Sequence, residues 1–191
     1  SKVHQHHFNV EFNAESLVIW RGAYHLNEEA IIEVKERLLE HPDSYMKAKG
    51  ADGNIWSSYF IKDIYARPEI EFLSIYNDLG VVIKETFYMH NSRSSFDYWS
   101  QLYDGSHEKH DHCSWETLFS FVHFVDPVGK NFHFLDGYGN KLYPKQDKGD
   151  IILFPSWATH AIDASYGKER FTIAGNIAFN SVHIAETGTQ Y

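Results

Sequence analysis

The chain has 191 residues, a formal net charge of −9, and aromatic residues at 16% of its positions. This length is sufficient for one domain with a buried core, and the aromatic content argues against a disordered chain. The acidic balance disfavours binding to a phosphate backbone, and no apolar run approaches the roughly 18 residues of a membrane-spanning helix. We therefore expect neither a nucleic-acid nor a membrane partner.

A single cysteine, Cys113, excludes an internal disulfide framework and fits a reducing compartment. No basic and then apolar leader is visible, so we expect a cytoplasmic protein. Cys113 is most simply a small filler residue, although a thiol near a metal is the alternative. The oligomeric state is not readable from the sequence.

Two helices are predicted before residue 90. Asn27 is a suitable N-cap for the first, whose apolar residues recur at helical spacing from Ile31 to Leu38 before His41 and Pro42 end it. Pro68 suits the first turn of the second helix, which has a broad apolar face. We expect residues 1–90 to form a helical support region within a single domain, 1–191.

Short apolar runs separated by turns follow residue 90. The turn signals include Asp104-Gly105, Asp126-Pro127 and Lys148-Gly149-Asp150. Such spacing indicates an antiparallel sandwich or barrel, with the helices packed on one outer sheet. The predicted strands are 96–103, 118–125, 131–135, 151–154 and 170–179.

Histidines are in excess, with 13 in the chain. His4, His6 and His7 are most simply a tail, whereas "HEKHDHC" places His110 and His112 two residues apart. On a strand, side chains at that spacing share a face, so both imidazoles can reach one metal ion. The alternative is a pair of surface histidines on a polar turn.

A second histidine segment is "GDIILFPSWATHAI", residues 149–162. A turn leads into an apolar strand, and a loop then carries His160. Loops at the end of rigid strands often deliver ligands. The alternative for His160 is a half-buried loop residue.

A third segment, "ERFTIAGNIAF", alternates an apolar face with a face that carries Arg170, Thr172 and Asn176. If the polar face is open to water, it needs no special role. If it faces a barrel interior, the guanidinium requires a buried anion, and its planar fork matches a carboxylate. Together with the histidines, this predicts a metal enzyme that binds a dicarboxylic acid.

These segments resemble the iron(II)- and 2-oxoglutarate-dependent oxygenases, and in particular a bacterial and phage branch that includes relatives of prolyl hydroxylases. The resemblance runs over "DYWSQLYDGSHEKHDH", "SFVHFV", "GDIILFPSWATHAI" and "RFTIAGN", within residues 97–176. It implies a mainly β double-stranded β-helix, or jelly roll, in residues 91–180, with N-terminal supporting helices.

The resemblance also implies a function and its site. The chain would be a dioxygenase that uses Fe(II) and 2-oxoglutarate to hydroxylate a small-molecule or peptide substrate, with peptidyl proline or an amino acid as examples by analogy. His110, His112 and His160 would bind the metal. The residues implied in cosubstrate binding are Arg170, Thr172, Tyr103 and Asn176.

One departure leaves alternatives open. Most of the family uses two histidines and one carboxylate, whereas position 112 is histidine and Asp111 would point away from His110 on a strand. Glu116 follows the pair at a spacing that is similar to the cupins, so a cupin-type metalloenzyme that does not use 2-oxoglutarate is the second hypothesis. A non-catalytic jelly-roll binding module is the third.

Substrate identity is not readable from the sequence. Residues 41–66 and 89–96 are candidate lids over the site. Trp99, Trp115 and Trp157 either line the pocket or pack in the core.

Overall fold

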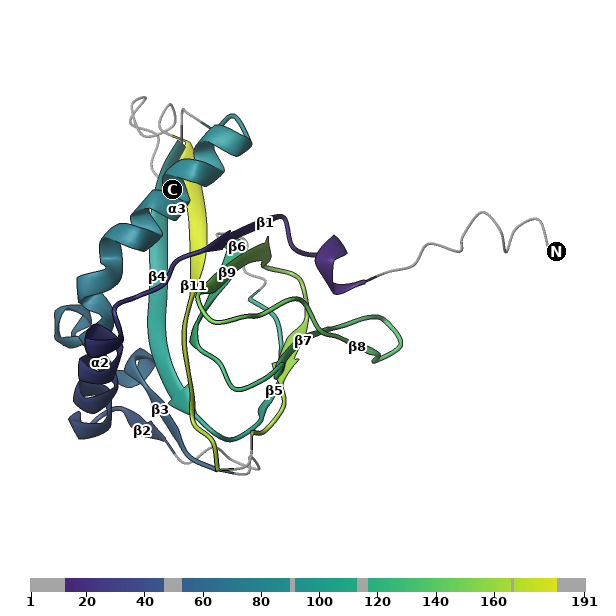
Figure 1. Ribbon diagram of the computed structural model, residues 1–191. Coiled ribbons are helices and arrows are strands. Elements are labelled where there is room, and N and C mark those ends of the chain that lie inside the picture. Colours follow the sequence, from purple (N-terminus) through teal and green to yellow (C-terminus); the bar gives the residue numbers. More distant parts are fainter. Residues whose placement is uncertain (1–12, 47–52, 90–91, 113–116, 166, 182–191) are drawn as a thin grey trace.

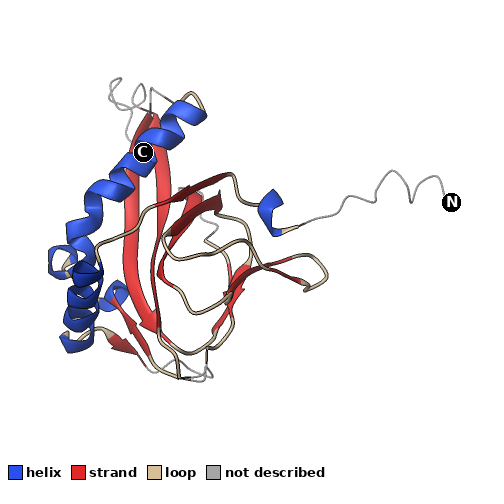
Figure 2. Cartoon of the chain, in the orientation of Figure 1, coloured by secondary structure: helices blue, strands red, loops and turns tan. Residues whose placement is uncertain are grey.

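The computed structural model describes residues 13–46, 53–89, 92–112, 117–165 and 167–181. Two antiparallel sheets, of seven and four strands, face each other, and the two main helices lie outside the larger sheet (Figures 1 and 2). The predicted double-stranded β-helix with supporting helices is thus confirmed.

The larger sheet has the order β1-β9-β6-β11-β4-β3-β2 and the smaller has the order β5-β10-β7-β8. The strands of the larger sheet are β1 (Trp20–Ala23), β9 (Asp150–Pro155), β6 (Thr117–Asp126), β11 (Arg170–Ser181), β4 (Ser92–Tyr103), β3 (Ile55–Ser57) and β2 (Tyr45–Met46). Those of the smaller are β5 (His107–His110), β10 (His160–Ile162), β7 (Phe132–Leu135) and β8 (Lys141–Leu142).

The first helix, α2 (Glu28–Glu40), begins after Asn27 as predicted, and the Asn27 side chain accepts hydrogen bonds from the backbone N–H groups of Glu29 and Ala30. The second helix, α3 (Leu73–Thr86), begins later than predicted. Pro68 instead opens a 3₁₀ segment, η4 (Pro68–Phe72), that leads into α3. The remaining 3₁₀ segments are η1 (Ala14–Ser16), η2 (Ser58–Phe60) and η3 (Ile64–Ala66).

The described part of the first 90 residues is less helical than the sequence suggested. It also supplies β1, β2 and β3, which extend the larger sheet at both of its edges. Period-based prediction missed these strands because each has only two to four residues, too few to display an alternation. Strand β4 likewise begins at Ser92, earlier than predicted.

The longest strand pair is β4 with β11. Its register determines which side chains of the larger sheet face the helices and which face the smaller sheet. The two strands stay in register from Arg170 opposite Tyr103 to Ser181 opposite Ser92. Because side chains alternate across a strand, Phe171, Ile173 and Leu102 point to the helices and join the core with α2 and α3. The intervening residues point between the two sheets.

Glycine is required at one position on β11. A Cβ on Gly175 would lie 2.5 Å from the Asp97 carbonyl oxygen and 2.6 Å from the Phe121 ring. The absence of a side chain therefore lets the central strands and the Phe121 ring approach closely.

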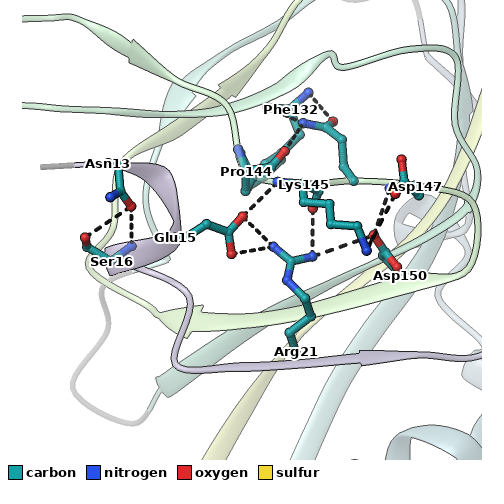
Figure 3. Close-up of polar contacts among 10 residues, drawn as sticks. Asn13, Glu15, Ser16, Arg21, Phe132, Pro144, Lys145, Asp147 and Asp150 are labelled. Atoms are coloured by element: carbon teal, nitrogen blue, oxygen red, sulfur yellow. Dashed lines mark hydrogen bonds and ion pairs between the residues drawn. The ribbon is translucent and has the colours of Figure 1, made fainter.

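A polar network fixes the N-terminal segment to the sheet (Figure 3). The Arg21 guanidinium on β1 donates to both Glu15 carboxylate oxygens, each at 2.7 Å, and to the Lys145 carbonyl oxygen at 2.8 Å. Beside it, the buried Gln146 side chain exchanges two hydrogen bonds with the backbone of Phe132. These contacts attach β1 and the loop before β9 to β7 in the smaller sheet.

A buried polar pair, Tyr76 and His123, lies in the core between helix and sheet. The Tyr76 hydroxyl lies 3.0 Å from Nδ1 of His123, and His123 Nε2 lies 2.9 Å from the Tyr24 carbonyl oxygen. The carbonyl can only accept, so Nε2 carries the proton and Nδ1 accepts from Tyr76.

Tyr76→Phe should therefore lower the free energy of unfolding by about 1–3 kcal/mol, because the buried Nδ1 of His123 loses its donor. Urea denaturation at neutral pH measures this change. Tyr65→Phe, at a side chain that is 79% exposed, is the matched control and should leave the stability unchanged. Equal stability of the two variants would contradict the prediction.

Candidate metal centre and cosubstrate pocket

The three predicted metal-binding histidines converge. His110 ends β5 and stands opposite His160, the first residue of β10, in the antiparallel register. His160 thus begins a strand rather than lying on a loop. His112 lies beyond the end of β5, so the expected single strand carrying both His110 and His112 is wrong; its backbone N–H donates to the Ser156 carbonyl oxygen at 2.9 Å.

One candidate nitrogen from each of His110, His112 and His160 lies within 4.8 Å of the other two. Neighbouring nitrogen ligands on one ion are roughly 3–3.5 Å apart, given metal–nitrogen bonds near 2.1 Å. Side-chain rotations that shorten these separations would bring all three onto one ion. Among the described residues, this is the group of histidine and acidic side chains whose geometry fits a metal.

A backbone contact orients the His160 ring. Its Nδ1 lies 2.9 Å from the Ala158 carbonyl oxygen, which can only accept a hydrogen bond. Nδ1 therefore carries the proton, and Nε2 is left with a lone pair for the metal. The Phe132 and Phe154 rings flank the imidazole at 5.4 and 5.3 Å.

Burial lowers the pKa values of two of these histidines, His112 and His160. Desolvation, with His110 nearby, lowers the pKa of His160 to about 3 and that of His112 to about 4. Both rings are consequently neutral at pH 7, which is the form that binds a metal.

A fourth histidine, His107, belongs to the same cluster and was missed by the sequence reasoning. Its ring centroid lies 4.5 Å from that of His110, and burial lowers its pKa to about 4, with His110, His112 and Arg170 adding to the shift. Strict alternation would put His107 and His110 on opposite faces. A β-bulge prevents this, because His107 and His110 pair with Ile162 and His160, which are only two apart.

The Arg170 side chain is buried, with only 3% exposed, so the solvated-face alternative is excluded. It donates to the Ser165 hydroxyl at 2.6 Å and to the Gly105 carbonyl oxygen, and its guanidinium carbon lies 3.9 Å from the centre of the Tyr103 ring. Its Nε has no hydrogen-bond partner, and no carboxylate of the described residues pairs with the guanidinium. A buried cation in this state favours an anionic ligand.

The structure places the remaining predicted cosubstrate residues along the same inner face. Tyr103 and Thr172 are buried beside Arg170. Asn176, however, lies six residues along β11, about 20 Å away at the rise of a strand. Its side-chain oxygen accepts from the Ser120 hydroxyl at 2.9 Å, so its position does not favour contact with the group that Arg170 binds.

A cavity joins the histidines to Arg170. About 670 Å³ of space in and around it, open solvent included, is not filled by protein atoms, and Trp99 contributes to its wall. Trp157 is exposed and does not line this cavity. The predictions for Cys113, Trp115, Glu116 and the histidines at 4, 6 and 7 lie outside the described residues.

No protein-family model matches the chain, and no curated protein matches it. Several solved structures are similar to the chain. A prolyl-4-hydroxylase from Pseudomonas putida is 16% identical with a TM-score of 0.59, over 83% of this chain and 91% of that chain. A Trichoplax adhaerens prolyl hydroxylase, in complex with a peptide fragment of the hypoxia-inducible factor oxygen degradation domain, is 12% identical with a TM-score of 0.57, over 92% and 89%.

The chain has the fold of the 2OG-Fe(II) oxygenases. The non-heme, α-ketoglutarate-dependent epimerase SnoN from nogalamycin biosynthesis is similar to the chain as well, with a TM-score of 0.58 at 14% identity over 83% of this chain and 77% of that chain. Since identities are this low, the likeness establishes the fold, and the chemistry must be argued from the site. In the described part of the chain, no helix has the length and apolarity to cross a membrane.

The low pKa values predict how the metal-free protein responds to acid. The folded-state pKa values of His107, His112 and His160 are about 4, 4 and 3, below the usual 6.5. At pH values between these pKa values and 6.5, the unfolded chain therefore binds more protons than the folded chain. The stability that the neutral rings contribute is lost as the pH falls through this range.

We expect the free energy of unfolding, measured with a chelator present, to fall from pH 7 to about pH 5. His160→Gln should show a smaller fall, because one of the titrating groups is gone. A wild-type stability independent of pH over this range would contradict the low pKa values.

Proposed function

We propose that this protein is an iron(II)- and 2-oxoglutarate-dependent dioxygenase that hydroxylates a small-molecule or peptide substrate. The observation that carries the proposal is a buried guanidinium without an acidic partner among the described residues, in the same cavity as a cluster of histidines. A buried arginine alone, or a histidine cluster alone, is compatible with a purely structural role. Together they match a ligand with a metal-chelating end and a free carboxylate.

In this proposal His110, His112 and His160 hold iron(II), and Arg170 binds the far carboxylate of 2-oxoglutarate. The bound iron supplies oxygen activation coupled to decarboxylation, so that 2-oxoglutarate, oxygen and a substrate C–H group become succinate, carbon dioxide and the hydroxylated product. The unpaired Nε of Arg170 is a donor ready for a carboxylate oxygen.

The protein's own contribution is orientation and exclusion of water. The Ala158 carbonyl holds the His160 ring in one tautomer, and aromatic rings around it restrict solvent. At the other end of the cavity, the Tyr103 ring supports the flat face of the guanidinium and leaves its edge available. Rigid strands carry both ends, which keeps their separation constant.

A site with three histidines and no carboxylate departs from the usual two histidines and one carboxylate. Asp111 is exposed, between His110 and His112, and Glu116 is the other candidate. If Glu116 were a ligand, a cupin-type metal site would be the better description. We favour the oxygenase because a cupin-type site leaves the buried Arg170 without an anion.

Arg170→Met should weaken 2-oxoglutarate binding about a hundredfold, since it removes one partner of a buried charge pair. The measurement is an anaerobic titration of the iron-loaded protein with 2-oxoglutarate, followed by the visible absorption band of the complex. Arg37→Met, at an exposed position on α2, is the matched control and should bind as the wild type does.

Metal affinity should be nearly the same in the two arginine variants, because neither side chain is a ligand. An unchanged 2-oxoglutarate affinity in Arg170→Met, or no visible band in the fully iron-loaded wild type, would refute the proposal.

Metal binding separates the oxygenase from the cupin alternative. His112→Gln should lower iron affinity more than about tenfold, since even residues behind the ligands change affinity by that much. Glu116→Gln should leave it nearly unchanged. The metal content of each variant after dialysis measures these two effects. His4, His6 and His7 are replaced by alanine in all samples, so that they do not bind metal themselves. A large loss in Glu116→Gln would favour the cupin-type site.

A further inference from the structure

The inner face of the β4–β11 pair changes charge along its length. Arg170 lies opposite Tyr103 at the buried end, and Asp97 lies opposite Asn176 at the exposed end. Between them Thr172 faces Gln101 and Ala174 faces Trp99. The histidine cluster lines both the cavity that contains Arg170 and the groove that contains Asp97. The interior is therefore cationic at its buried end and acidic at its exposed end.

The acidic end belongs to a groove between η2 and β4. Its walls include the aromatic side chains of Tyr59, Phe60 and Trp99, together with Asp97, and its floor reaches the histidine cluster. Tyr59 is 55% exposed, and its ring meets that of Trp99 edge-on with centroids 5.3 Å apart. Trp99 continues the aromatic wall to His112, at a centroid distance of 6.0 Å.

The Asp97 carboxylate has no hydrogen bond or ion pair to any described residue. It is therefore available to a ligand, which a carboxylate engaged in a structural ion pair would not be. Aromatic ring faces carry negative electrostatic potential and attract cations, and a carboxylate beside them adds to that attraction. The overall charge of −9 acts in the same direction on an approaching cation.

We propose that this groove binds the substrate through an alkylammonium group, which pairs with Asp97 and lies against the Tyr59 and Trp99 rings. The inference rests on the proposed oxygenase function, because it assigns the substrate class of that site. The ammonium would lie beside Asp97, and the carbons attached to it would lie in the groove that reaches the histidines. A lysyl side chain and a free diamino acid share this chemistry, and the choice of probes distinguishes them.

The groove also offers a neutral alternative. Aromatic walls stack on a proline ring without needing a charge. In that case Asp97 would be dispensable, and a neutral probe would bind as well as a cationic one. The charge of the probe is therefore the variable to test.

Binding is measured by the shift of the Trp99 indole N–H resonance, which the Trp99→Phe spectrum identifies. The probes are Nα-acetyl-lysine methylamide, free lysine, the uncharged Nα-acetyl-norleucine methylamide and Nα-acetyl-proline methylamide. All are added to the metal-free full chain, so that binding is observed without turnover. The lysine derivative should bind more tightly than its norleucine counterpart.

Asp97→Asn should weaken binding of the lysine derivative about fivefold at low salt, as expected for an exposed ion pair, without changing norleucine binding. Salt should reduce the difference. Asp78→Asn removes the same charge from an exposed position on α3 and should bind as the wild type does. Tyr59→Leu keeps an apolar wall but removes the ring, and should weaken the lysine derivative about threefold.

Free lysine binding as tightly as the methylamide would support a small-molecule substrate, and preference for the methylamide would support a lysyl residue in a peptide. Four results would overturn the inference: equal binding of norleucine, tighter binding of the proline probe, unchanged binding in Asp97→Asn, or no shift with the lysine derivative at about 10 mM.

The 2-oxoglutarate titration distinguishes a failure of the proposed substrate class from a failure of the proposed oxygenase function. Asp97→Asn should bind 2-oxoglutarate as the wild type does. A protein that binds 2-oxoglutarate but not the ammonium probes overturns only the substrate class. One that binds the probes but not 2-oxoglutarate overturns the oxygenase function.

Discussion

The long antiparallel pairing of β4 with β11 is the constraint on which the rest of the molecule depends. Over twelve residue pairs, each strand sends alternate side chains to the helices and to the interior. Phe171 and Ile173 anchor the outer core, and this fixes Arg170 and Thr172 on the inner face. A slip of one residue would exchange the two sets, burying charge in the helical core, so the apolar packing enforces the register of the site.

The histidine cluster depends on departures from regular strand geometry. His107 and His110 share a side because a bulge offsets β5 against β10. His112 joins them from beyond the end of β5, where the Ser156 carbonyl holds its backbone. Bulges next to functional sites re-aim side chains. The smaller sheet therefore supplies imidazoles in directions that an ideal strand could not provide.

Electrostatics divides the interior into regions. Desolvation keeps His112 and His160 neutral, the Arg170 guanidinium lies at the buried end, and the Asp97 carboxylate lies at the exposed end. Such an arrangement discriminates between ligands by the sign of charge at each end, and most strongly at the buried Arg170, where the dielectric is low. The aromatic residues of η2, within the segment predicted as a candidate lid, complete the wall at the exposed end.

The sequence by itself determined the capped helix α2 and the five main strands of an antiparallel sandwich or barrel, because periodic segments and turn residues act locally. The jelly-roll class followed from the family resemblance of residues 97–176. The sequence also selected His110, His112, His160 and Arg170, because of the His-x-His spacing, the histidine after an apolar strand, and the guanidinium on the polar face of an alternating segment. Only the tertiary structure decided that Arg170 is buried without an acidic partner among the described residues, that His107 joins the cluster, and that Asn176 and Asp97 lie at the opposite end from Arg170. These features depend on pairing between segments distant in the chain and on a bulge, neither of which local periodicity encodes.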